Sequence, residues 1–148
     1  MQNQQNFFRI IQLGTNANIY KLDFPTRGIN KEHKKHFKPN LVPIVWNNQL
    51  NLNDCIRINE IFNPSKFMSE LVEIMQEKYD NYYIEISNNE LEFRIYRDEE
   101  GEDQTEITVK LYRYPDGYIL GFNRIQATDN NFLDIKTNVS DLISNMPN

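Results

Sequence analysis

The two histidines are the side chains of this sequence best suited to chemistry, and they lie three residues apart. His33 and His36 belong to the segment Lys31-Glu32-His33-Lys34-Lys35-His36-Phe37-Lys38. On a helical turn this spacing places both rings on one face, where Glu32 would add an oxygen ligand for a metal ion. The lysines around them oppose a bound cation, and no further His or Cys pair completes a metal site. A solvated basic loop is therefore favoured over a metal centre, and we expect no metal ion and no cofactor.

The same lysine-rich segment is better suited to binding an anion or an acidic surface. Its four lysines and two histidines, together with Phe37, match phosphate contacts and one stacking ring. Docking onto an acidic protein, including the rest of this chain, is the favoured use of the segment. Binding of nucleic acid or acidic lipid is the second use, and a plain solvated loop is the third. The candidate contact residues for a partner or an anion are Arg27, Lys31, His33, Lys34, Lys35, His36, Lys38 and Trp46.

The remaining reactive side chains do not form a catalytic pattern. Cys55 is the single cysteine, so an internal disulfide and a cysteine-based zinc site are both excluded. It lies in an apolar segment with no histidine near in sequence, which favours a core cysteine over a nucleophile. Carboxylates such as Glu85, Glu90 and Glu92 are expected on a hydrated surface. We therefore expect no catalytic residue and no enzyme activity.

Composition indicates one well-cored domain and two regions of opposite charge. The chain has 148 residues, with 39% hydrophobic and 25% charged residues and a net charge of -5. Residues 1–49 hold seven Lys and Arg against two Asp and Glu, whereas residues 50–148 hold nine against nineteen. This asymmetry predicts a basic N-terminal arm over residues 1–50 and an acidic domain over residues 51–148. The arm either has a separate task or lies on the acidic domain.

Apolar runs are too short for a membrane span, which needs roughly 20 residues. The stretch Met1 to Asn6 is polar and has neither a basic region nor an apolar region of the kind found in secretory signals. We expect an intracellular protein, cytoplasmic or nuclear, with no transmembrane segment.

The N-terminal arm is irregular, with one predicted strand. Tyr20, Leu22 and Phe24 alternate with polar residues, which predicts a strand over Ile19 to Phe24. The apolar run from Leu41 to Trp46 would anchor the arm on the domain or on a partner. Trp46 within it is either a buried plug or an interface anchor, and the sequence leaves both open.

The acidic domain reads as strand, helix, four strands, helix. Asn63-Pro64 predicts the first helix start, because Asn caps free amides and Pro tolerates the first position; the helix runs to about Tyr79. Alternating residues then predict antiparallel strands joined by Asn88-Asn89, by the acidic loop Asp98 to Asp103, and by Pro115-Asp116-Gly117. Asn88-Asn89 is expected to form a tight turn, because both residues tolerate positive φ. The last helix is capped by Asp129 or Asn130. A strand with five apolar residues precedes the first helix: Cys55, Ile56, Ile58, Ile61 and Phe62.

These patterns predict an α+β fold. It comprises an antiparallel sheet of four to five strands, two helices packed on one face, and an irregular N-terminal extension. In the last turn before the final strand, Pro115 presets φ and Gly117 takes the left-handed position.

Residues 52–146 resemble the kinase-associated domain 1 family, the C-terminal module of microtubule-affinity-regulating kinases and their relatives. The likeness is carried by the strand Tyr118 to Ile125, the polar turn Gln126 to Asn130 and an aromatic-led helix at Phe132. The opening, Ile58 to Met75, is similar to the family's strand, polar Pro-containing turn and first helix. A polo-box-like sheet-plus-helix domain is the nearest competing fold. The resemblance implies a non-catalytic module that binds anionic phospholipid or restrains a kinase domain.

The sequence has no Gly-rich loop and no His-Arg-Asp segment, so it contains no kinase domain. Family members bind lipid through basic clusters, whereas residues 50–148 carry about -10 here. We therefore expect a non-catalytic protein-interaction or regulatory subunit that docks into a larger multi-subunit enzyme complex, including one that acts on nucleic acid. The alternative is an anion-binding module that uses Lys31 to Lys38 to hold acidic phospholipid or nucleic acid.

Overall fold

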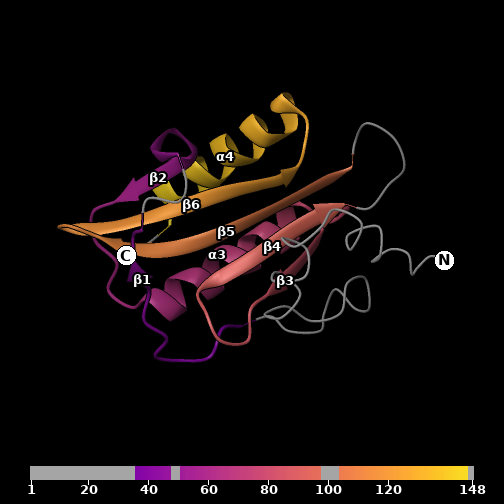
Figure 1. Cartoon of the computed structure of the whole chain (residues 1–148). Coiled ribbons are helices and arrows are strands. Elements are labelled where there is room, and N and C mark those ends of the chain that lie inside the picture. The colour runs from indigo at the N-terminus through magenta and orange to yellow at the C-terminus, as the bar shows by residue number, and fades with distance from the viewer. Residues whose placement is uncertain (1–35, 48–50, 98–103, 147–148) are drawn as a thin grey trace.

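The computed structural model describes residues 36–47, 51–97 and 104–146 (Figure 1). The predicted strand Ile19 to Phe24 and the acidic loop Asp98 to Asp103 lie outside these residues. The elements follow in the order β1 (Ile44–Val45), a 3-10 turn (Leu52–Asp54), β2 (Cys55–Ile58), α3 (Pro64–Lys78), β3 (Tyr83–Ile86), β4 (Glu92–Arg97), β5 (Thr105–Tyr114), β6 (Gly117–Gln126) and α4 (Asp129–Ser144). From β2 onward this is the predicted strand, helix, four strands, helix.

The sheet is antiparallel along the order β2-β6-β5-β4-β3. Strand β1 pairs in parallel with β5, at Tyr112 and Arg113. This pairing lies beyond the part of β5 that contacts β4, which ends at Lys110. The sheet therefore gains a short sixth strand beside the tip of the β5–β6 hairpin.

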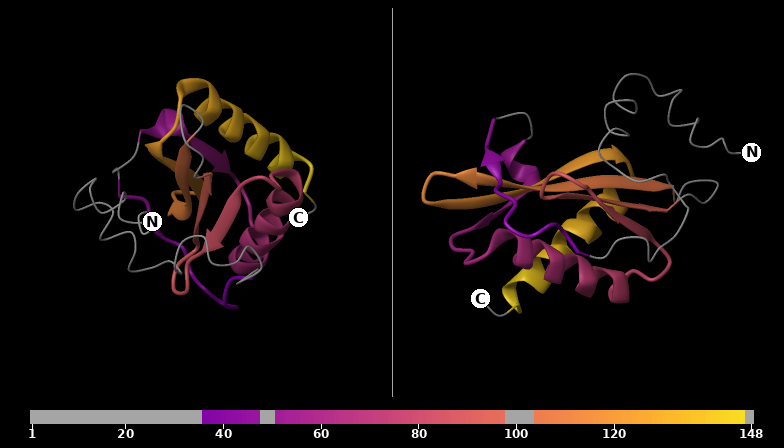
Figure 2. Two further views of the ribbon diagram at one scale, coloured as in Figure 1. Left: turned by 90° about the vertical axis from the view of Figure 1, so that its right-hand side faces the viewer. Right: turned by 90° about the horizontal axis from the view of Figure 1, so that it is seen from below.

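Both helices cover one face of the sheet, as the alternating pattern predicts (Figure 2). The apolar side chains of the strands on that face are buried with the helices; among them are Ile84, Phe93, Ile95, Ile107, Val109, Leu120 and Phe122. The opposite face carries no described helix, and we call it the helix-free face. None of the helices within the described ranges is long and apolar enough to cross a membrane.

Helix α3 begins where the sequence predicts. The Asn63 side-chain oxygen accepts a hydrogen bond from the Lys66 amide at 3.1 Å, and Pro64 fills the first helical position. The helix ends at Lys78, one residue before the predicted end at Tyr79. Its buried stripe includes Met68, Leu71 and Met75, so one face is committed to the core.

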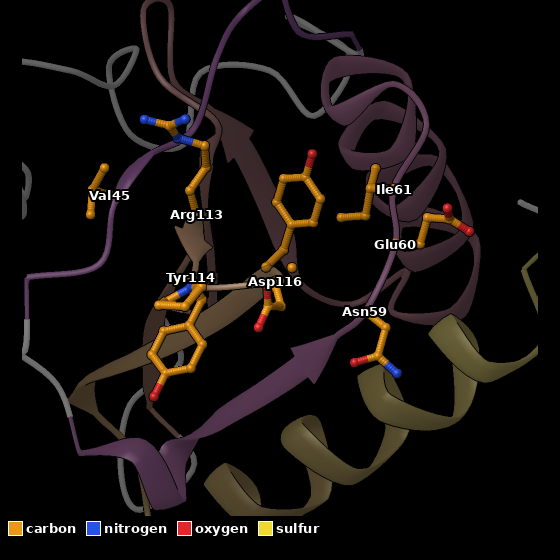
Figure 3. Close-up of a pocket in the computed structure, with 10 residues that line it drawn as sticks. Val45, Asn59, Glu60, Ile61, Arg113, Tyr114 and Asp116 are labelled. Carbon is orange, nitrogen blue, oxygen red and sulfur yellow. The ribbon is translucent and has the colours of Figure 1, made fainter.

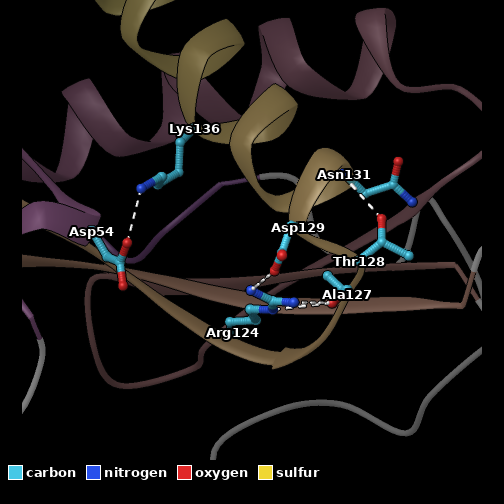
Figure 4. Close-up of polar contacts among 7 residues, drawn as sticks. All are labelled: Asp54, Arg124, Ala127, Thr128, Asp129, Asn131 and Lys136. Carbon is cyan, nitrogen blue, oxygen red and sulfur yellow. Dashed lines mark hydrogen bonds and ion pairs between the residues drawn. The ribbon is translucent and has the colours of Figure 1, made fainter.

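Helix α4 is capped by Thr128, so the prediction of Asp129 or Asn130 as the cap is wrong (Figure 4). The Thr128 hydroxyl accepts a hydrogen bond from the Asn131 amide at 3.1 Å. The Asp129 carboxylate instead pairs with Arg124 of β6 at 2.8 Å. Two turns along α4, Lys136 pairs with Asp54 at 2.9 Å and so connects the helix to the start of β2.

Three further details differ from the sequence prediction. At the β5–β6 turn, Asp116 and not Gly117 takes the left-handed conformation, with φ 65°. In the β3–β4 loop, neither Asn88 nor Asn89 has positive φ; the Ser87 hydroxyl holds the loop by accepting from two backbone amides. Phe62, predicted in an apolar strand, is 96% exposed.

Candidate functional site

The predicted contact residues are only partly described by the structure. Arg27, Lys31, His33, Lys34 and Lys35 lie outside the described residues. His36 and Lys38 are exposed. They flank a phenylalanine that packs into the core, so the expectation of a free stacking ring at this position is wrong.

That phenylalanine and the residues after it attach the end of the predicted arm to the domain. Phe37 is 5% exposed, and its amide donates to the Ser69 hydroxyl of α3 at 2.9 Å. Four residues on, the Leu41 amide donates to the Ser65 hydroxyl at 2.9 Å. The segment therefore runs along α3 before it reaches β1.

Trp46 contacts the domain on the helix-free face. Its amide donates to the Arg113 carbonyl at 2.9 Å, and its ring meets the Tyr112 ring edge-on with centroids 5.1 Å apart. The side chain is half-buried. Trp46 therefore packs against the sheet as a plug would, and its exposed part leaves the alternative of an interface anchor open.

A cleft of about 510 Å³ lies at the tip of the β5–β6 hairpin (Figure 3). Val45 of β1 lies on one side of the hairpin and Ile61 on the other, in the linker between β2 and α3 (Figure 3). We call it the hairpin cleft, and its lining residues are Val45, Asn59, Glu60, Ile61, Arg113, Tyr114, Pro115, Asp116, Gly117 and Tyr118. Its volume lies within the usual range for binding pockets.

The backbone fixes the shape of this cleft. A Cβ atom placed on Gly117 would lie 2.8 Å from the Ile58 carbonyl oxygen and 3.0 Å from that of Asn59, so only glycine allows the linker to approach the turn this closely. Across the hairpin, the Arg57 guanidinium lies 5.1 Å from the centre of the Tyr114 ring. The sequence predicts that Gly117 takes a left-handed φ, whereas in the structure Gly117 allows the backbone of the linker to pass close to the turn.

Four exposed apolar side chains lie in the two segments that border the hairpin cleft, one on each side of the hairpin. Val42, Ile44 and Val45 are 72%, 45% and 58% exposed, although Pro43 between them is buried. Phe62, which follows the cleft-lining Ile61, is almost fully exposed. We call these four side chains the apolar rim. The sequence singled out the Pro43 to Trp46 run but missed Phe62, because an apolar residue next to a strand is ordinarily interpreted as core.

The lining of the hairpin cleft combines charged and apolar side chains. Its lining includes the charges of Glu60, Arg113 and Asp116, but it contains no His, Cys, Ser, Thr or Lys. Over the described ranges, no three metal-ligating side chains come together. A mixed-charge cleft with an apolar rim suits an apolar side chain flanked by polar groups.

Cys55 is half-buried, so the prediction of a core cysteine is wrong. The alternate residues Ile56 and Ile58 face the core, which directs the Cys55 thiol to the helix-free face. Burial, reinforced by the nearby Asp54 carboxylate, raises the pKa of the Cys55 thiol above its ordinary value of 9.0. A raised pKa lowers the thiolate fraction at neutral pH, which disfavours nucleophilic chemistry.

The helix-free face holds a second polar cluster, and it is buried. Arg94 of β4 pairs with Glu85 of β3, and its guanidinium lies 3.5 Å from the Glu106 carboxylate of β5. The Tyr96 hydroxyl donates to Glu85 at 3.1 Å, and the Tyr83 ring stacks on that of Tyr96. Sequence reasoning placed Glu85 on a hydrated surface, and this is wrong: its side chain is only 7% exposed.

Lys110 of β5 continues this face toward β1. It pairs with Glu90 and lies 5.7 Å from the centre of the Tyr112 ring. Burial works to lower the pKa of Lys110, but the bond to Glu90 and the charge of Glu92 outweigh it and raise that pKa above 10.5. Burial likewise raises the pKa of Tyr112.

No protein-family model matches this chain, and no curated protein matches it either.

Proposed function

We propose that this protein is a non-catalytic subunit that binds a protein partner through the hairpin cleft and the apolar rim, and so docks into a larger enzyme complex. The observation that carries the proposal is Phe62, which is 96% exposed directly beside a lined cleft. Burying a phenylalanine against a partner is worth about 1.5–3 kcal/mol, so an aromatic ring left in water beside a cleft is a strong anchor.

The surroundings of Phe62 support this reading. Four of the six large hydrophobic side chains that are exposed in the described residues belong to the apolar rim. Apolar side chains exposed beside a cleft are typical of protein interfaces. The flanking Glu60 and Arg113 would orient a partner that presents an apolar side chain between a basic and an acidic group.

The element order supports a relationship to kinase-associated domain 1, which is part of the proposal. That resemblance implies a strand, a helix, four strands and a helix, and β2 to α4 follow this order. Members of that family act on kinase domains, and this sequence has none of its own. The proposed partner is therefore a subunit of an enzyme.

Native purification with matched variants tests the proposal. A tagged full-length chain would be compared with Val45→Ser/Phe62→Ser, and with Leu133→Ser as control. Leu133 on α4 is 58% exposed, the same fraction as Val45, but lies outside the rim. Quantitative mass spectrometry should show at least one partner that is lost with the rim variant and retained with the control. A partner set that is identical for all three chains would contradict the proposal.

The second candidate function is an anion-binding module that uses Lys31 to Lys38. The exposure of His36 and Lys38 favours it. Replacing Lys34, Lys35 and Lys38 with Ala should then abolish a salt-dependent interaction with anionic vesicles or oligonucleotides. Absence of binding by the unmodified chain at low salt rules this candidate out.

A further inference from the structure

The helix-free face is shielded from water, although both helices lie on the other side of the sheet (Figure 2). Five polar or aromatic side chains of β3, β4 and β5 that point to this face are between 1% and 7% exposed: Glu106, Arg94, Tyr96, Thr108 and Glu85. One cross-strand row runs Asn123, Thr108, Arg94, Glu85 across β6, β5, β4 and β3. Only Asn123, at the β6 end of this row, is exposed.

The buried part of the helix-free face does not extend over the whole face. Trp46 covers Tyr112 near the β1 end of the face. Both described helices lie on the other face of the sheet (Figure 2), and a buried charge such as that of Arg94 is stable only where surrounding groups shield and pair it. The face therefore has a cover over β3, β4 and β5 that stops short of Asn123.

We propose that residues 1–35 of this chain lie across the helix-free face over β3, β4 and β5. The inference stands apart from the proposed function, because the hairpin cleft plays no part in it. Length permits the arrangement, since an extended chain spans about 3.3 Å per residue and neighbouring strands lie about 4.8 Å apart. The point of attachment permits it too, because Phe37 is fixed to α3 and only His36 separates it from the segment.

Charge favours this occupant. Residues 1–35 contain six Lys and Arg against two Asp and Glu. The covered face and its border hold four carboxylates against the two cations Arg94 and Lys110; the four are Glu85, Glu90, Glu92 and Glu106. A basic segment with three Phe, four Ile and one Tyr therefore complements a face of carboxylates and tyrosine rings.

Paramagnetic relaxation in the full-length chain tests the proposal. In a Cys55→Ser background, a spin label on Asn123→Cys lies on the helix-free face at the border of the cover. The control label on Thr137→Cys lies at an exposed position of α4. Amide signals from residues 1–35 should lose more than half of their intensity with the first label and keep it with the second. The same signals unaffected by either label, or weakened equally by both, would overturn the proposal.

Two further measurements identify the occupant. If the signals weaken only when spin-labelled chain is mixed with isotope-labelled chain, the cover comes from a second copy and the proposal for the same chain is wrong. In the unmodified chain, carbodiimide should join a lysine of residues 1–35 to Glu90 or Glu92. The variant Lys31→Glu/Lys34→Glu/Lys35→Glu, which changes no described residue, should lose both this cross-link and most of the relaxation effect; retention of both would contradict the charge argument.

Discussion

Arg94 and Glu85 lie directly opposite each other on β4 and β3 and form an ion pair inside a water-shielded part of the sheet. The Arg94 side chain is only 1% exposed. Glu106 of β5 approaches the same guanidinium, so Arg94 contacts two carboxylates. This arrangement makes Arg94 the electrostatic centre of the helix-free face.

Replacing Arg94 should therefore be costly. Arg94→Met removes the cation shared by two buried carboxylates, and breaking a buried pair in this way costs about 3–5 kcal/mol of unfolding free energy. Arg113→Met, at an exposed position of β5, should change it by less than about 0.5 kcal/mol. Urea denaturation followed by circular dichroism measures both. Equal effects of the two variants would show that the Arg94 cluster is not a buried network.

The close approach at the β5–β6 turn predicts a second effect. Gly117→Ala places a methyl group 2.8 Å from the Ile58 carbonyl, and because the clash is with backbone the linker must move. We expect Gly117→Ala to lower the free energy of unfolding by about 1–3 kcal/mol, as at other overpacked sites. Asp116, the residue before Gly117, itself has a left-handed φ of 65°. Asp116→Gly places at this position a residue that adopts such a φ without strain, so thermal stability should stay equal or rise. Gly117→Ala as stable as the unmodified chain would contradict this geometry.

The α4 cap can be tested by a pair of neighbouring substitutions. Thr128→Ala removes the hydroxyl that accepts from the Asn131 amide and should cost about 1 kcal/mol. Asn130→Ala, inside the helix and exposed, should cost much less. The two unfolding free energies decide between the cap in the structure and the one predicted from sequence: a larger loss for Asn130→Ala would restore the sequence prediction.

Stability should fall as the solution becomes alkaline. The pKa values of Tyr112 and Lys110 are raised above 10.0 and 10.5, so the folded chain holds these protons longer than the unfolded chain. Their stabilising contribution is complete below pH 10 and is lost as pH rises through the folded-state values. Above pH 10, the free energy of unfolding obtained from denaturation curves should fall less steeply with pH for Tyr112→Phe than for the unmodified chain. An identical decline for both chains would rule out Tyr112 as a contributor.

Much of the fold follows from local pattern. Asn63-Pro64 and the apolar stripe of α3 predict that helix to within one residue, because capping and burial act on neighbouring residues. Alternation predicts which side chains of β3 to β6 face the helices, since strand residues point to opposite sides. The sequence predicts the α4 cap one or two residues late, because Thr, Asp and Asn all cap well and because Asp129 pairs with Arg124 instead.

The candidate sites depend on contacts between distant segments and were harder to predict. Alternation assigns Glu85 and Arg94 to the polar side of the sheet but does not show whether that side is exposed to solvent. Phe62 is exposed at a bend of the linker between β2 and α3, and nothing in the local pattern marks that bend. The hairpin cleft needs Val45 and Gly117 side by side, more than 70 residues apart in sequence.

Hydrogen exchange on the purified complex tests the central claim of partner docking most directly. Exchange of backbone amides would be followed by mass spectrometry in the chain alone and in complex with the partner recovered by native purification. We predict slower exchange in peptides that span Val42 to Trp46, Asn59 to Phe62 and Arg113 to Tyr118, with no change in α4 around Leu133. Protection confined to α4, or no protection at the hairpin cleft, would contradict the account.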